Sequence, residues 1–266
     1  MSSPTKFEAK KQDLSDFLSS FGPGVEDIRL SVDRQPALNG VLTGGVATST
    51  HFLTKRMDVV SFENGDIVIA DLAKVLAFLR ACSDETVHLR QVVSDNDVGN
   101  LSIICGKSTI SLPGTQTVRS RESYDVALRL VESCQESDYK EFGDAPLTCY
   151  GVIDISELSP ISALGKVVGN DKPYHFSFVA DNREGVIHTG TSTTGQMFHK
   201  FEIYNAVDES DEKVSKTKFG PWFSDVISCI PHGKSEVWTG ADNVLIFDHS
   251  DEDFILVVID QAAGDE

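Results

Sequence analysis

The stretch DLAKVLAFLRACSDETVHLR, residues Asp71 to Arg90, predicts a helix that ends at a polar turn and is followed by a strand. When its residues are placed at 100° steps, one arc of the helix is apolar and the opposite arc is small and basic. The apolar arc holds Leu72, Val75, Leu76, Leu79 and Cys82, whereas the opposite arc holds Ala73, Lys74, Ala77, Phe78, Arg80 and Ala81. No acid follows Asp71 in this helix, although the formal net charge of the chain is -18. The apolar arc is an ordinary core face, and the question is what the basic arc contacts.

Length and composition place the chain among globular proteins. With 266 residues it can form one large domain or two of ordinary size, and 40% hydrophobic and 24% charged residues are typical of globular chains. No apolar run approaches the roughly 18 residues of a membrane span, and the N-terminus MSSPTKFEAKK lacks the apolar centre of a signal peptide. We therefore expect an intracellular protein without a membrane partner.

The cysteines and the charge limit the chemistry further. Five cysteines without a CxxC pair indicate a reducing compartment and thiols that serve as small core residues. A pI near 4.7 argues against a protein that coats nucleic acid by its bulk charge, but it leaves room for a local basic surface.

A helix-then-strand unit recurs four times along the chain. In each unit, apolar residues at helical spacing are followed by a turn rich in Gly, Pro or Asp and then by an alternating strand. The four units span residues 7–33, 71–90, 150–181 and 218–242. Many short strands with close turn signals surround them, which predicts mainly antiparallel sheets.

The second and third units also resemble each other in sequence, with Leu72 matching Leu158 at a separation of 86 residues. The sequence thus predicts a β-rich α+β fold with internal duplication, in which two similar domains each carry two helices on antiparallel sheets. We expect an N-terminal domain over residues 1–113 and a C-terminal domain over residues 147–266. Residues 114–146 form the expected connector, with one strand-like segment at Val126 to Val131.

Catalytic and ligand-binding motifs are incomplete or absent. GKST at Gly106 to Thr109 lacks the earlier glycine of a phosphate-binding loop, because position 101 is Leu101. The seven histidines show no metal-binding spacing, although His175, His188 and His199 lie in predicted strands and could cluster. No nucleophile motif is present. We therefore predict no catalytic residues, no metal site, no cofactor and no enzymatic activity.

Four stretches, in their order along the chain, resemble the DNA sliding clamps. KFEAKKQDLSDFLSSF (Lys6 to Phe21) and the stretch from Asp71 to Ile104 are similar to the first helix, the second helix and the following strands of the proliferating cell nuclear antigen family. GKSTISLPGTQTV (Gly106 to Val118) is closer to the T4-type bacteriophage clamps, and Ser235 to Asp260 resembles the closing strands of both groups. The end VVIDQAAGDE and the long connector depart from the cellular pattern and favour a viral or divergent clamp.

The resemblance implies the clamp fold and a ring. For two-domain subunits it implies a homotrimer, with twelve helices lining a hole through which double-stranded DNA passes without sequence recognition. It also implies a DNA polymerase and a clamp loader as partners, in the host cytoplasm for a bacteriophage protein or in the nucleus for a eukaryotic or eukaryotic-virus protein. An acidic exterior and basic helices would then coexist, because sparse Lys and Arg contacts attract phosphates without reading bases. The expected DNA-binding residues are Lys10, Lys11, Lys74, Arg80, Lys166, Lys218 and Lys234.

Two further surfaces follow from the resemblance. Ring closure would pair an edge strand at Ser102 to Leu112 with one at Gln196 to Tyr204 of the next subunit. The expected subunit-interface residues are Ile104, Thr109, Ile110, Met197, His199 and Phe201. The expected pocket for partner peptides contains Leu112, Pro113, Val118, Val257 and Ile259, although these residues could equally pack a domain junction.

The sequence is also compatible with two other functions. An acidic, β-rich structural or assembly protein of a virion, with no role on DNA, would share the charge and the strand content. An enzyme that uses a histidine cluster of the second domain is the other alternative. Basic residues that face a common hole distinguish the clamp from the structural protein, and metal analysis of the purified protein tests the enzyme.

Overall fold

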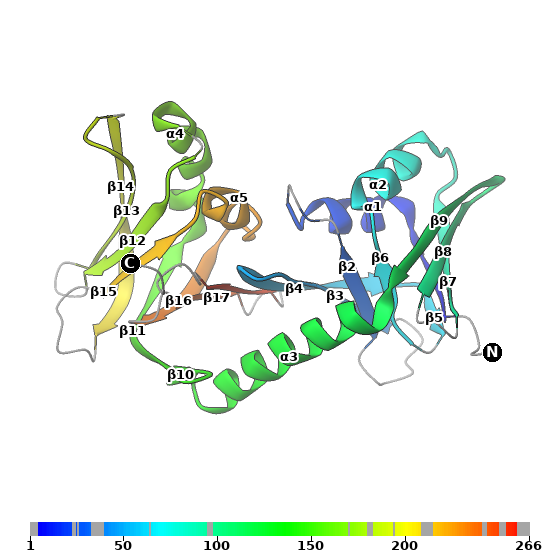
Figure 1. Cartoon of the computed structure of the whole chain (residues 1–266), viewed down its shortest axis with the longest axis horizontal. Helices are drawn as coiled ribbons and strands as arrows, with labels where there is room; N and C mark the ends of the chain where they lie inside the picture. Colours follow the sequence, from blue (N-terminus) through cyan, green and yellow to red (C-terminus); the bar gives the residue numbers. More distant parts are fainter. Residues whose placement is uncertain are drawn as a thin grey trace. The chain divides into compact units, whose positions relative to one another are not determined.

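A computed structural model describes residues 5–22, 25, 27–32, 40–63, 65–94, 98–169, 171–179, 183–193, 195–208, 215–240, 244–249 and 254–259 (Figure 1). The chain divides into two compact units. The first contains residues 1–47 and 54–126, and the second contains residues 48–53 and 127–266. Each unit combines antiparallel strands with packed helices, which confirms the predicted α+β class.

The first unit contains two helices and two groups of strands. One group has the order β5-β1-β7-β8-β9, and in the other β2 lies between β3 and β6. Its elements are β1 (Thr5–Lys10), α1 (Lys11–Ser19), β2 (Ile28–Val32), β3 (Gly40–Ala47), β4 (His51–Val59), β5 (Ser61–Glu63), β6 (Ile67–Ile69), α2 (Leu72–Ala81), β7 (Thr86–Val93), β8 (Val98–Cys105) and β9 (Ser108–Gln116).

Helix α2 is the helix predicted from the opening stretch. Asp71 adopts a left-handed conformation before it (φ 60°), and its side chain accepts a hydrogen bond from the Lys74 amide, as expected of an N-cap residue. Leu72, Val75 and Leu79 are buried, whereas the small and basic arc is exposed except for Phe78, which is half-buried. The amphipathic pattern therefore placed both faces of this helix correctly.

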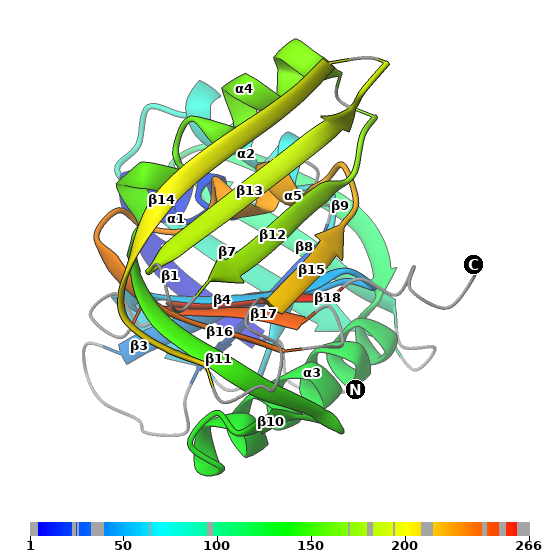
Figure 2. The same ribbon diagram turned by 90° about the vertical axis from the view of Figure 1, so that its left-hand side faces the viewer.

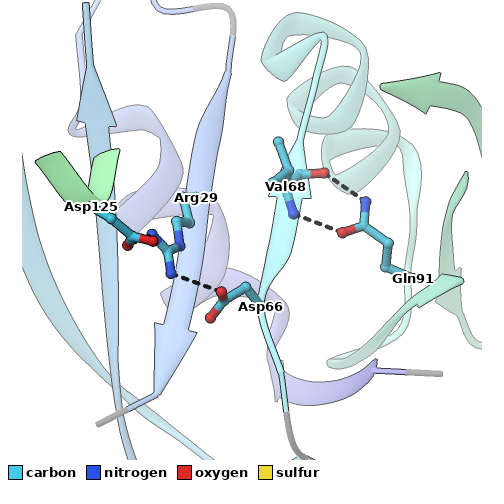
Figure 3. Close-up of polar contacts among 5 residues, drawn as sticks. All are labelled: Arg29, Asp66, Val68, Gln91 and Asp125. Atoms are coloured by element: carbon cyan, nitrogen blue, oxygen red, sulfur yellow. Dashed lines mark hydrogen bonds and ion pairs between the residues drawn. The ribbon is translucent and has the colours of Figure 1, made fainter. Parts of the chain in front are cut away.

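Gln91 joins the two groups of strands in the first unit (Figure 3). Its side-chain amide donates to the Val68 carbonyl at 3.0 Å and its carbonyl accepts from the Val68 amide at 2.9 Å. Gln91 thus takes the place of a neighbouring strand along β6. Both residues are fully buried, so the Val68 peptide groups have no route to water.

Replacing Gln91 by Leu should lower the free energy of unfolding by about 2–4 kcal/mol, because it leaves a buried N–H and a buried C=O without partners. Urea unfolding followed by circular dichroism measures the change. Val92→Leu, at an exposed site on the same strand, is the matched control and should stay within about 0.5 kcal/mol of the wild type. Equal stability of the two variants would contradict this role of Gln91.

The second unit has the strand order β15-β12-β13-β14-β11-β16-β17-β18, with residues 48–53 at the start of β4 beside β18. Strands β12 to β15 form one face in Figure 2. The elements are β10 (Glu141–Phe142), β11 (Ala145–Asp154), the 3-10 helix η1 (Ile155–Leu158), α4 (Ile161–Val168), β12 (Tyr174–Val179), β13 (Glu184–Thr191), β14 (Gly195–Asp208), β15 (Ser215–Phe219), α5 (Phe223–Ile227), β16 (Lys234–Gly240), β17 (Val244–His249) and β18 (Phe254–Ile259).

The two units repeat one order of elements. Apart from β10 and η1, each unit opens with a strand and a helix, continues with five described strands in the first unit and four in the second, and closes with a second helix and three strands. Helix α4 starts 150 residues after α1 (Ile161 against Lys11), and α5 starts 151 residues after α2 (Phe223 against Leu72). The predicted duplication is therefore present, but the offset of 86 residues was wrong. It aligned α2 with α4, which hold different places in the repeat.

The connector contains a long helix, α3 (Thr117–Glu136), which begins in the first unit and ends in the second. The strand expected at Val126 to Val131 is wrong. Its six residues alternate, but the buried positions Tyr124, Val131 and Cys134 are seven and three residues apart, which is helical spacing. Short alternation inside a helix of this length misled the interpretation.

Aromatic and charged contacts attach α3 at both ends. In the first unit, the Arg29 guanidinium lies 4.8 Å from the centre of the Tyr124 ring and forms ion pairs with Asp66 and Asp125 (Figure 3). In the second unit, Tyr139 follows the helix and stacks on Trp238 with ring centres 3.8 Å apart. The Tyr139 hydroxyl also donates to Asp248, and burial, followed by this hydrogen bond, raises the pKa of Tyr139.

Candidate nucleic-acid interface

Four of the predicted DNA-binding residues lie on or directly before the helices of the first unit. They differ in exposure and in whether they already bind another group of the protein. Lys10 and Arg80 are exposed, and no ion pair is found for either in the described part of the chain. Lys74 is exposed but pairs with Asp71, whose pKa the Lys74 side chain holds below its ordinary value. Lys11 is different, because its ammonium group donates to the Cys82 carbonyl at 2.7 Å and so joins the start of α1 to the end of α2.

The exposed side of α1 is acidic. Asp13 and Asp16 point to solvent, and the Gln12 amide donates to both carboxylate oxygens of Asp16 at 2.9 Å. The basic character of this helix pair therefore comes from α2 and from Lys10, and not from both helices equally.

In the second unit, one of the three predicted cations lies on a helix. Lys166 is exposed on α4. Lys218 lies on β15 directly opposite His175 of β12, on the exposed face of strands β12 to β14, whereas its neighbours Thr217 and Phe219 are buried. The Lys234 ammonium lies 5.2 Å from the centre of the Tyr204 ring on β14. Lys218 precedes α5 in the chain, as expected, but strand alternation directs its side chain away from the buried face, and its contact with DNA stays a prediction.

Several strand edges are open within the described residues, among them those of β5, β15, β9 and part of β14, and the last two belong to the strands predicted for ring closure. Strand β9 ends the five-stranded sheet, and residues 195–202 of β14 pair with β13 on one side only, since β11 pairs with the later residues 203–208. Thr109 and Ile110 lie on the open strand β9. Ile104 lies on β8, which has partners on both sides, so its predicted place on an edge strand is wrong. Gly106 and Lys107 form the turn between β8 and β9, so GKST opens no helix.

On β14 the prediction selected the wrong face. Met197 and Phe201 are 8% and 4% exposed, and His199 is half-buried with its ring nitrogen Nε2 in hydrogen-bond contact with the Glu157 carbonyl. The residues between them point outward, and Phe198 is 60% exposed. Because the side chains of a strand alternate, a shift of one residue exchanges the two faces. Phe198 is the residue at this edge that sequence reasoning missed.

Phe198 ends a row of rings on the exposed face of the second unit. The rings of His188 and Phe198 stack with centres 4.5 Å apart, and those of His175 and His188 lie 5.5 Å apart. Burial, then the neighbouring His188 and Lys218, lower the pKa of His175. His199 lies on the other face of β14, so the three histidines do not converge. In the described residues, no group of three or more His, Cys, Asp or Glu side chains could hold a metal ion.

The residues of the predicted partner pocket belong to both units and differ in exposure. Leu112 and Val257 are 6% and 0% exposed and pack inside their own units, which leaves little of either side chain for a partner to contact. Pro113 is exposed and Ile259 is half-buried, so both remain accessible. The side chain of Val118 lies outside the described residues.

Among the comparisons with known proteins, only the solved structures match this chain, and they show its fold. No family model and no curated protein sequence matches the chain. Among solved structures, the chain is similar to the DNA polymerase sliding clamp of Caulobacter crescentus, with a TM-score of 0.68 and 11% identity, over 97% of this chain and 66% of that one. The PCNA of Thermococcus kodakaraensis gives a TM-score of 0.58 at 9% identity, over 96% of this chain and 99% of that one.

A third structure, the Helicobacter pylori β clamp bound to a DNA ligase peptide, gives a TM-score of 0.62 at 14% identity, over 98% of this chain and 68% of that one. The chain thus spans about two thirds of the bacterial clamps and nearly all of the archaeal clamp. These similarities confirm that the chain has the sliding-clamp fold, as its sequence resemblance indicated. No helix among the described residues is long and apolar enough to span a membrane.

Proposed function

We propose that the protein is a DNA sliding clamp, a non-catalytic ring of three copies that encircles duplex DNA and tethers a polymerase. The sliding-clamp fold and the length shared with the archaeal clamp support this proposal. The observation that carries it is a pair of open strand edges, β9 and β14, which by element order are the equivalents of two strands that already lie side by side within the chain, β18 and β4.

The chain makes once, internally, the strand pairing that a ring would repeat. In the second unit, β18 lies beside the start of β4, where the Ile259 amide donates to the Thr50 carbonyl at 2.8 Å. By element order, β9 is the equivalent of β18 and β14 is the equivalent of β4. These two equivalents are the open edges. Pairing β9 of one copy with β14 of the next is a head-to-tail contact, which closes a ring when its rotation allows.

Side chains at these edges suit an interface. Ile104 lies directly opposite Thr109 of β9 and is 36% exposed, and Phe198 on β14 is 60% exposed. Helix α4, which packs against β13 and β14, adds Val167 at 81% exposure. Pairing of the edges would give backbone hydrogen bonds, and burial of these apolar side chains would stabilise the contact.

Light scattering tests the assembly. At tens of micromolar protein we expect three times 29.0 kDa, or about 87 kDa. A particle of 29 kDa across this concentration range would contradict the ring.

The DNA contacts are proposed to be made by Lys74, Arg80 and Lys166 on the helices and by Lys10, which ends β1 directly before α1. Such contacts attract phosphates, depend on salt and carry no sequence preference. The proposed partners are a polymerase and a clamp loader, by analogy with the clamps that the chain resembles. The ligase peptide on the H. pylori clamp supports binding of partner peptides, for which Pro113 and Ile259 are the accessible candidates.

Replacing Asp71 by Asn should strengthen DNA binding. Asparagine still caps α2, but it releases Lys74 from its ion pair. The dependence of log Kd on log salt should steepen by about 0.9 for each additional phosphate that the protein neutralises, measured by fluorescence anisotropy on a short duplex. Glu63→Gln is the matched control, because it frees Lys6 on β1 and not on a helix, and should change nothing. An equal response to both variants would contradict the placement of DNA along α2.

A further inference from the structure

The exposed faces of the two units carry similar pairs of residues near the open strand edges. In the second unit, the exposed Phe198 of β14 lies directly opposite His188 of β13. In the first unit, Ile104 of β8, beside the open strand β9, lies directly opposite His88 of β7. Each of these apolar side chains, which are proposed to meet a second copy, is therefore backed by an imidazole. Imidazole is the side chain that ordinarily gains a charge between about pH 8 and 5.

The two histidines differ in what lies behind them. The His88 ring nitrogen Nδ1 is 3.6 Å from a carboxylate oxygen of Glu8, so a proton on His88 completes an ion pair. His188 instead lies directly opposite His175, with ring centres 5.5 Å apart, and Lys218 lies directly opposite His175 on the next strand. A proton on His188 is therefore added beside a second titratable base and a permanent cation, rather than beside an acid.

The Nε2 atom of His188 offers no place for a charged ring in its present orientation. It is shielded from water and has no hydrogen-bond partner among the described residues. Farther along the same face, the Lys200 ammonium already pairs with Glu184 at 2.8 Å, and Glu202 lies opposite Glu184. Helix α4, which carries Lys166, packs on the opposite face of these strands. Both ring nitrogens carry hydrogen in the charged imidazole, so Nε2–H would have no acceptor whichever nitrogen takes the proton.

Charging His188 should therefore break its stack with Phe198. The two rings are nearly parallel, with 13° between their planes and 4.5 Å between their centres. To reach water, the Nε2–H group must turn out of this stack, and the Phe198 ring then loses the support that positions it. The attraction of a cation for an aromatic ring at an exposed site is weaker than the cost of a buried donor without an acceptor.

Contact with a second copy favours the neutral pair still more. Covering Phe198 removes water from the whole stack, and burial disfavours the charged form of an imidazole. The pKa of His175 is already lowered by burial and then by His188 and Lys218. Separate copies thus hold protons at acid pH that assembled copies must release. The contact has its full strength above about pH 6.5, the ordinary pKa of histidine, and weakens as the pH falls below it.

We propose that the open edge of β14 is a pH-sensitive contact with a second copy, which protonation of His175 and His188 opens. This switch rests on the proposed ring and deepens it, because it assigns the sensitivity to the second unit. The edge at β9 tolerates acid, since the proton that His88 gains is neutralised by Glu8. A ring built on these edges would open at its subunit boundaries when the solution becomes acidic.

Light scattering over a concentration series, at pH 7.5 and pH 5.5 and constant ionic strength, tests the switch. Exclusion of one proton from each contact should raise the Kd of the wild-type contact about tenfold at the lower pH. The double variant His175→Gln, His188→Gln should keep its Kd within about twofold, because glutamine stays neutral. It also reports the effect of the changing net charge of the chain. His88→Gln is the matched control and should respond like the wild type.

The outcomes separate the switch from the ring. Circular dichroism at both pH values checks that each protein is folded, and His188→Gln alone decides the result if the double variant does not fold. An equal wild-type Kd at the two pH values, or a tenfold response that survives the loss of His188, would overturn the switch while the ring stands. A wild type of 29 kDa at pH 7.5 would overturn the ring and the switch together.

Discussion

Replacing Arg29 by Met should lower the free energy of unfolding of the first unit by about 3 kcal/mol, which is the low end for removing one partner of a buried ion pair. The Arg29 side chain is 11% exposed and lies between the carboxylates of Asp66 and Asp125. Its pKa is raised by these two acids despite the opposing effect of burial, so it stays charged at any pH at which the protein is folded. Methionine preserves much of the volume and leaves two negative charges without their cation.

The low end is expected because Asp125 is 48% exposed, so water can solvate part of the charge that Arg29 leaves behind. Urea unfolding gives the value, provided that the m-value is unchanged. Arg90→Met is the matched control, because Arg90 is exposed on β7. Asp125→Asn should cost less than Arg29→Met. A loss below about 1 kcal/mol for Arg29→Met would show that the ion pairs contribute little, as exposed pairs do.

Replacing Phe198 by Glu should weaken the proposed contact between copies by at least about tenfold in Kd, or about 1.4 kcal/mol for each contact. A large apolar surface would no longer be buried, and a carboxylate would have to lose water in the interface. The side chain is 60% exposed in the single chain, so the stability of the second unit should stay nearly constant. Light scattering over a concentration series measures the shift from three copies to one.

Val207→Glu provides the matched control on the same strand. Val207 is 47% exposed but lies where β14 already pairs with β11, opposite Tyr150. It should leave the mass of the assembly unchanged. If Phe198→Glu also leaves the assembly intact, or if both variants dissociate it equally, the open edge of β14 is not the contact.

The periodicity of apolar residues predicted helices and strands better than it predicted which of their faces are covered in the folded protein. The apolar spacing of Leu72, Val75 and Leu79 defined both a helix and its buried face, because a 3.6-residue period depends only on local sequence. The same reasoning failed for α3, where a six-residue alternation outweighed the longer helical spacing that begins at Tyr124. It also failed for Phe198, because the face of an edge strand depends on which side the helices cover.

Polar residues inside the fold were missed for a different reason. Gln91 stands at an inward position of an alternating strand, after Val87 and Leu89, and a polar residue in that place was a usable signal. Arg29 alternates outward from its apolar neighbours on β2, and nothing local indicates that two acids from distant segments surround it.

Retention on DNA with blocked ends tests the encircling claim most directly. The protein is first bound to linear duplex DNA, both ends are then blocked with streptavidin, and the complex is washed at about 1 M salt, where charge contacts are largely screened. A closed ring should remain on the blocked DNA, leave after a restriction cut, and be lost when Phe198 is replaced by Glu. Release at the same rate from blocked and open DNA would contradict the ring.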